Sequence, residues 1–227
     1  MCSRFDLKSS PDATQQHFAY STPATFPPRE KIAPTDPIMI IRNKTIDQRE
    51  AVLVRWGFIP HWVKNPDDFP LIINARAETL LEKPSFRTSL AHKRGLLPAT
   101  AFYEWSGPKG RRDMHKFHPP TEEPFALACL WDHWLGADGS EFESAAIITV
   151  AANKDIAPYH DRMPAYLTKD DYQAWLDVKN VSAKDALKLL KPAATGVFSP
   201  TTSKHKNNKK PKQQSAKNKS PDQGELF

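Results

Sequence analysis

Short runs of apolar and β-branched residues, each bounded by Pro, Gly or Asp, recur along most of the chain. Such runs are typical of β-strands, and we expect strands at 38–41, 51–58, 71–73, 96–105, 125–131 and 145–151. Helical patterns are fewer: they predict helices at 11–20 and 78–90, and two late helices that follow Thr168 and Ser182. Strands outnumber helices without regular alternation, so the pattern predicts an α+β fold built on a β-rich core.

Composition changes near residue 203. From Ser203 onward almost nothing apolar remains until Leu226 and Phe227, so we expect residues 203–222 to be disordered. The remainder of the 227-residue chain is long enough for one large domain or two small ones, and 39% hydrophobic residues can fill a core. We expect a single domain over 1–202 and a Lys-rich tail over 203–227.

Basic charge is concentrated in that tail. Seven lysines stand against two acidic residues between 201 and 227, whereas residues 1–200 hold 25 basic and 24 acidic residues. The formal charge of +6 therefore says little about the folded part, whose affinity for nucleic acid must come from a local patch. The tail could add a salt-sensitive attraction to phosphates.

Several classes of protein are excluded by what the sequence lacks. No run approaches the ~18 apolar residues of a membrane span, and the first residues lack the apolar core of a signal peptide, so we expect a cytoplasmic protein. Two cysteines, Cys2 and Cys129, are too few for a disulfide scaffold. His115, His118, Cys129 and His133 do not have the pattern of a zinc site, and no glycine-rich phosphate loop occurs. We expect no metal and no cofactor.

Cys2 is the first candidate for chemistry, because removal of Met1 would leave it with a free α-amine. The amine, with a pKa of about 7.7–8.0, and the thiol, with a pKa of about 8.5, are then two nucleophiles on one residue. Such a 1,2-aminothiol condenses with an aldehyde: the amine forms an imine and the sulfur closes a thiazolidine ring. Taken alone, a single cysteine favours the simpler interpretation that Cys2 is incidental.

Glu104 ends an apolar run between Tyr103 and Trp105. Dehydration by its neighbours Phe102 and Trp105 would raise its pKa toward the range that suits proton transfer. An outward-facing position on the strand would instead leave an ordinary surface acid. The spacing favours neither interpretation.

Asn74 and Arg76 follow the expected strand 71–73 on one face, where an amide and a guanidinium suit a phosphate or a sugar. A polar strand end is the simpler explanation. His160 lies in a loop beside Asp161, and it is either an acid or base near neutral pH or merely an exposed side chain.

These residues stand in motifs that follow one another from residue 2 to about residue 200. The motifs are Met1-Cys2-Ser3-Arg4-Phe5, Ile32-Ala33-Pro34-Thr35, Arg55-Trp56-Gly57-Phe58-Ile59-Pro60, Asn74-Ala75-Arg76-Ala77-Glu78-Thr79, Pro98-Ala99 with Phe102-Tyr103-Glu104-Trp105, and His160-Asp161-Arg162-Met163-Pro164. In this order they resemble the SOS-response-associated peptidase family, whose members are also described as abasic-site processing proteins.

The resemblance implies a single compact domain around a β-barrel-like core with flanking helices, and a positively lined cleft for single-stranded DNA. In that cleft Cys2 would crosslink to an abasic site, Glu104 would move protons, and His160 would assist opening of the sugar ring. Asn74 would orient the cysteine or the sugar. The implied DNA-binding residues are Arg4 and Arg76 on phosphates and Trp62 as a wedge or stacking surface.

The implied product is a covalent thiazolidine adduct that shields the lesion during the DNA damage response, formed by a monomer associated with the nucleoid. Ser3 stands where the family usually has Gly, which bears on DNA docking and leaves the four implied catalytic residues intact. One alternative is a thiol peptidase that uses Cys2 with His160, including autocatalytic removal of Met1. The other is a non-catalytic module that binds single-stranded DNA.

The last five residues form a separate motif. Gln223-Gly224-Glu225-Leu226-Phe227 fits Q-x-x-L-F, which resembles the peptide that bacterial replication and repair proteins use to bind the sliding clamp. Leu226 and Phe227 have no core to join, so they are available to a pocket of another protein. The alternative is that they simply end the chain.

Overall fold

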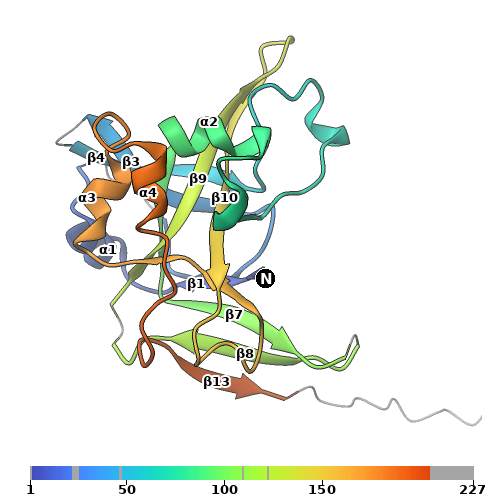
Figure 1. The fold of residues 1–227 in the computed structure, drawn as a ribbon, viewed down its shortest axis with the longest axis vertical. Helices are drawn as coiled ribbons and strands as arrows, with labels where there is room; N and C mark the ends of the chain where they lie inside the picture. Colours follow the sequence, from blue (N-terminus) through green and yellow to red (C-terminus); the bar gives the residue numbers. More distant parts are fainter. Residues whose placement is uncertain (1, 22–25, 46–47, 109, 122, 205–227) are drawn as a thin grey trace, which may run out of the picture.

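The computed structural model describes residues 2–21, 26–45, 48–108, 110–121 and 123–204. Two β-sheets form most of the domain: one curls into a barrel, the other lies beneath it in Figure 1, and helices lie on the outside. This arrangement confirms the predicted α+β domain with a β-barrel core and flanking helices.

Among the described residues, five strands close the barrel: β3 (Pro37–Thr45), β4 (Gln48–Trp56), β6 (Arg94–Ala99), β9 (Phe125–Leu135) and β10 (Glu141–Ala151). They pair in the order β10-β4-β3-β6-β9, and β9 pairs with β10 to complete the ring. All of β6 and most of β10 are buried, because both faces of these apolar strands are covered.

The second sheet brings the N-terminal strand beside the middle of the chain. Its strands are β1 (Phe5–Leu7), β2 (Arg29–Ile32), β7 (Ala101–Ser106), β8 (Asp113–His118) and β13 (Ser199–Ser203), in the order β13-β8-β7-β1-β2. The expected strand 96–105 is therefore two strands that meet at Thr100. The Thr100 amide donates to the Asp6 carbonyl at 2.7 Å, so the chain leaves the barrel where it reaches β1.

Four described α-helices lie outside the sheets: α1 (Pro11–Phe18), α2 (Pro84–His92), α3 (Asp171–Leu176) and α4 (Ala183–Leu187). Both expected late helices are present, and Ser182 Oγ caps α4 by accepting the Asp185 amide at 3.1 Å. The expected helix 78–90 begins only at Pro84, because a residue before proline is held extended, as Lys83 is at ψ 122°. No helix among the described residues is long and apolar enough to cross a membrane.

The strand expected at 71–73 is wrong by three residues. The chain pairs instead at β5 (Asn74–Arg76), which runs parallel to β10 with Asn74 opposite Ile147. Residues 71–73 contribute an isolated bridge between Ile72 and Phe58. Contact with β10 begins only at the Ile73 carbonyl, which accepts the Ile147 amide at 3.0 Å. Two further short strands, β11 (Arg162–Pro164) and β12 (Tyr166–Leu167), pair with β10 and β9.

The buried Arg94 side chain, 2% exposed, ties the helical side of the domain to β6. Its guanidinium donates at 2.6 to 3.0 Å to four backbone carbonyls, those of Leu90, Trp175, Asp177 and Val181. The ends of α2 and α3 therefore depend on one side chain.

We expect Arg94→Met to lower the free energy of unfolding by about 3 kcal/mol, because the carbonyls lose their donors inside the protein. Urea denaturation measures the change. Arg87→Met, on the exposed side of α2, is the matched control and should change the free energy by less than ~0.5 kcal/mol. Equal effects of the two substitutions would contradict this role of Arg94.

Candidate active site

The buried carboxylate of Asp6 holds β1 in the second sheet. It accepts hydrogen bonds from the Lys31 amide at 2.7 Å and the Tyr103 hydroxyl at 2.9 Å, and it lies 2.7 Å from Lys116 Nζ. These partners belong to β2, β7 and β8, so β1 is fixed between its neighbours. The segment that begins with Cys2 is fixed with it.

Cys2 lies in the interior, with no exposed surface. Asn74 Nδ2 donates to the Cys2 carbonyl at 2.7 Å, and Cys2 Sγ donates to the Arg4 carbonyl at 3.4 Å. Burial, and after it the charge of Glu104, raise the pKa of the Cys2 thiol to about 12. The thiol is therefore protonated at neutral pH and needs a base in order to react as a thiolate.

Glu104, on β7, is 1% exposed, so it is not the outward-facing surface acid. Burial raises the pKa of its carboxyl to about 7. His160, between β10 and β11, brings Nε2 to 4.0 Å from Glu104 Oε2, while its Nδ1 accepts the Arg162 amide at 2.9 Å. Burial also lowers the pKa of His160, so a neutral imidazole faces the carboxyl.

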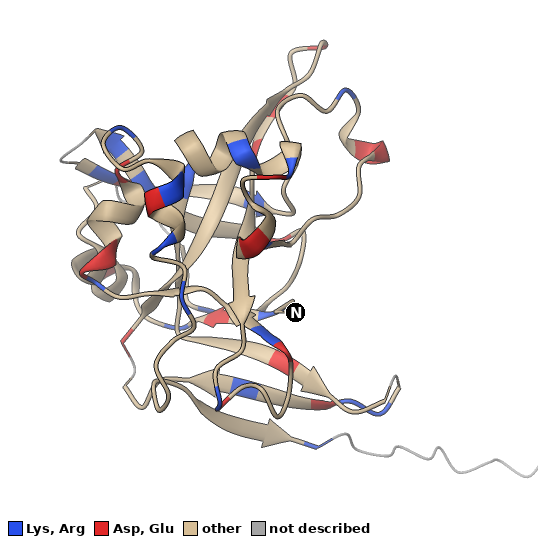
Figure 2. Ribbon diagram, in the orientation of Figure 1, with Lys and Arg blue, Asp and Glu red and all other residues tan. Residues whose placement is uncertain are grey.

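Arg4 and Arg76 add positive charge beside these groups. The Arg4 guanidinium lies 5.5 Å from the centre of the Trp105 ring, and Arg76 is exposed on β5, two residues from Asn74 and on the same face of the strand. Elsewhere Lys and Arg are interspersed with acidic residues over the fold (Figure 2). The positive character of the site therefore comes from a few particular side chains rather than from a broad basic surface.

An ion pair that the sequence did not reveal links two parts of the site. Arg162 donates to Glu78 from both terminal nitrogens of its guanidinium, at 2.7 and 2.8 Å. Glu78 lies in the 3-10 turn η2 (Ala77–Thr79) just after β5, and Arg162 follows His160 by two residues. Both belong to quoted motifs, but they are 84 positions apart, and no local pattern relates such distant residues.

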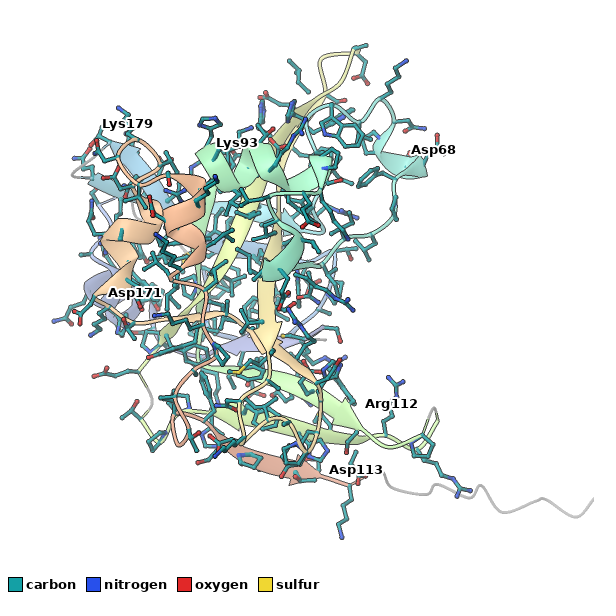
Figure 3. All side chains as sticks on the ribbon, in the orientation of Figure 1. Asp68, Lys93, Arg112, Asp113, Asp171 and Lys179 are labelled. Carbon is teal, nitrogen blue, oxygen red and sulfur yellow. The ribbon has the colours of Figure 1, made fainter. Side chains whose placement is uncertain are left out.

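Trp62 belongs to a different segment of the chain. It belongs to the loop 57–73, called here the Trp62 loop, which includes the 3-10 turn η1 (Pro66–Asp68) and is marked by the Asp68 label in Figure 3. Its side chain is 50% exposed and meets the Phe69 ring edge-on, with 6.0 Å between the ring centres.

A cavity of about 1010 Å³ lies beyond the other end of β1, lined in part by Lys8 and Lys116, and none of the four candidate catalytic residues borders it. No group of three metal-ligating side chains occurs among the described residues.

Ser203, the first residue of the expected tail, ends β13. The expected clamp-binding residues, Gln223, Leu226 and Phe227, lie outside the described residues.

Comparison with known proteins finds a matching family and several similar proteins. The profile of the family described as SOS response associated peptidase (SRAP) matches residues 1–208. The chain belongs to this family. Abasic site processing protein YoqW of Bacillus subtilis is 37% identical over 197 residues, which cover 85% of this SRAP chain and 87% of YoqW. Abasic site processing protein HMCES of Gallus gallus is 32% identical over 195 residues, which cover 73% of this chain and 58% of HMCES.

Solved structures agree with the SRAP fold described above. A crystal structure of a protein from Bacteroides thetaiotaomicron matches with a TM-score of 0.79 at 26% identity, covering 88% of this chain and 91% of that one. One from Bordetella bronchiseptica matches with a TM-score of 0.77, also at 26% identity, covering 90% and 100%. The family resemblance drawn from the motifs is confirmed.

The buried Glu104 should make stability depend on pH. Its pKa rises from an ordinary value of 4.5 to about 7 on folding, so ionisation penalises the folded state increasingly as the pH rises through that interval. Glu104→Gln removes the penalty. We therefore expect the variant to gain unfolding free energy relative to wild type from about pH 4.5 to about pH 8, measured by urea denaturation.

The exposed Glu82→Gln is the control for this pH dependence and should show no such trend. A difference between Glu104→Gln and wild type that stays constant over the same pH range would mean that the carboxyl has an ordinary pKa in the folded protein.

Proposed function

We propose that this SRAP protein processes abasic sites in single-stranded DNA by attaching itself covalently to them through Cys2, once Met1 is removed. The observation that carries the proposal is the convergence of a buried thiol, a buried carboxyl with a pKa of about 7 and a neutral imidazole beside the start of β1. The relatives that are named abasic site processing proteins support the same substrate.

The reaction requires an aldehyde, which an abasic site presents when its sugar ring is open. The Cys2 α-amine adds to the aldehyde carbon, and loss of one water gives an imine. The Cys2 sulfur then bonds to the imine carbon and closes a thiazolidine, while the nitrogen takes up the proton that the thiol gives up. A lysine would stop at the imine, which promotes β-elimination and strand cleavage. The thiazolidine removes that route and shields the lesion.

Glu104 is suited to carry the thiol proton. Because the pKa of the Cys2 thiol is about 12, little thiolate is present at neutral pH and the proton must leave as the carbon–sulfur bond forms. A carboxyl with a pKa of about 7 is partly ionised there, so it can take the proton from sulfur and return it to nitrogen. The His160 imidazole beside it would assist opening of the sugar ring and stabilise the intermediate.

The neighbouring side chains would hold the substrate. Asn74 fixes the Cys2 carbonyl, and its own Oδ1 is buried without a hydrogen-bond partner among the described residues, so it can accept from the Cys2 amine or from a sugar hydroxyl. Arg4 and Arg76 would bind the phosphates next to the lesion, a task that suits guanidinium groups. Trp62 would stack on a base of the same strand.

The two alternatives have less support. A thiol peptidase needs a thiolate beside a protonated imidazole, whereas burial raises the pKa of Cys2 and lowers that of His160, which disfavours both charged forms. A module that only binds DNA has no need of a buried carboxyl beside a buried thiol, since burying such groups costs free energy.

Cys2→Ala should abolish the stable adduct with abasic single-stranded DNA, read on a denaturing gel. Affinity for undamaged single-stranded DNA should change by less than about twofold, because the phosphate contacts belong to other residues. Cys129→Ala is the matched control, since Cys129 is equally buried, on β9, and should crosslink like wild type. Adduct formation by Cys2→Ala at the wild-type yield would refute the mechanism.

A further inference from the structure

The Trp62 loop is held more firmly than the exposure of Trp62 suggests. Its residues Ile59 and Val63 form a small buried cluster with Trp134, and Phe69 and Phe142 pack against that cluster. A single exposed aromatic side chain is ordinary on a protein surface. An exposed tryptophan is less ordinary on a loop that has its own buried cluster. The contacts that fix this loop are therefore important.

Asp132, on β9, is the central residue among the contacts that fix this loop. One oxygen of its buried carboxylate accepts the His61 amide at 3.0 Å and lies 3.0 Å from His61 Nδ1. The other binds Lys93 Nζ and accepts the His133 amide at 2.9 Å. Burial acts to raise the pKa of Asp132, but the hydrogen bonds from Lys93 and His61 outweigh it and lower that pKa, so the carboxylate stays charged.

Trp62 therefore stands between two anchored neighbours. On one side His61 is bound to Asp132 through both its backbone and its ring. On the other side the Val63 carbonyl accepts the indole N–H of the largely buried Trp134 at 2.6 Å. The backbone on both sides of Trp62 is fixed before any ligand arrives, which lowers the entropy that binding would otherwise cost.

The Trp62 loop and the Cys2 site both contact strand β10. The Ile59 amide donates to Ser144 Oγ on β10 at 2.9 Å, while Asn74, which holds Cys2, is paired with Ile147 of that strand. Three residues of a strand span about 10 Å. A DNA strand held at Cys2 can therefore bring a base near the lesion to the Trp62 loop.

We propose that Asp132, acting through His61, is a positioning residue that holds Trp62 as a preformed stacking surface for an unpaired base of the DNA strand. The inference rests on the proposed function in one respect, that the ligand is single-stranded DNA. It adds a pair of residues, Asp132 and His61, that touch neither the lesion nor the reacting atoms and set the affinity for the strand beside it.

A double-mutant cycle tests this dependence. The affinity of wild type, His61→Ala, Trp62→Ala and the double variant for undamaged single-stranded DNA is measured by fluorescence anisotropy at one fixed salt concentration. Loss of one stacked base should weaken binding about tenfold in Trp62→Ala, and His61→Ala should weaken it severalfold. The double variant should bind no worse than Trp62→Ala, because His61 acts through Trp62. Additive losses, or wild-type affinity in either single variant, would overturn the proposal.

The chain offers a matched control and a rescue. His133 Nε2 lies 3.0 Å from Glu141, and its side chain is exposed to a similar degree to that of His61, 40% against 46%, yet it lies outside the Trp62 loop. His133→Ala should bind DNA like wild type. His61→Asn places an amide N–H near the position of Nδ1 and should restore most of the affinity that His61→Ala loses. Failure of the rescue with a folded variant would count against a positioning role.

Failure of this inference is distinguishable from failure of the proposed function. The cycle uses undamaged DNA and reads only binding, whereas the crosslink uses abasic DNA and reads only the adduct. If the cycle is additive while wild type still forms its adduct, the positioning role alone is wrong. If the cycle shows coupling while no adduct forms, the covalent mechanism alone is wrong.

Discussion

The position of the N-terminal segment depends on the buried carboxylate of Asp6. Chain termini are ordinarily poorly ordered unless something ties them down, and β1 is only three residues long. Asp6 supplies the tie through Lys31, Tyr103 and Lys116, one partner from each of three strands. Because β1 is fixed, Cys2, which lies just before this strand, is fixed too, and Asn74 of β5 donates to its carbonyl. The fold thus holds Cys2 in a fixed position, and under the proposed mechanism this preorganises it for attack on a bound electrophile.

Burial then has useful effects on two ionisable groups at once. It keeps the Cys2 thiol protonated, and therefore weakly reactive toward oxidants, because the thiolate is the reactive form. The same burial moves the pKa of Glu104 close to neutral pH, where a carboxyl can both accept and return a proton. Under the proposed mechanism the α-amine reacts first and the sulfur follows. A thiol that is inert until an imine forms beside it would favour aldehydes over other electrophiles.

Much of the fold could be predicted because apolar runs such as those of β3, β9 and β10 are long enough to show a strand pattern. The β5 strand was misplaced because its pairing is set by distant β10 and not by its own polar sequence. Of the candidate site, the motifs supplied residues that the structure brings close together, Asn74 to Cys2 and His160 to Glu104, while their catalytic roles stay predictions. The Glu78–Arg162 pair and the His61–Asp132 contact were not found, since partners 84 and 71 positions apart leave no periodic signal in one sequence.

The central claim is that Cys2 acts through both its amine and its sulfur, and mass spectrometry of the N-terminal peptide before and after incubation with abasic single-stranded DNA tests it directly. The account predicts that Met1 is absent and that the adduct lies on the peptide beginning with Cys2. Its mass should equal the sum of peptide and DNA less one water. An adduct carried by a lysine, or one that forms with Met1 still attached, would contradict the mechanism.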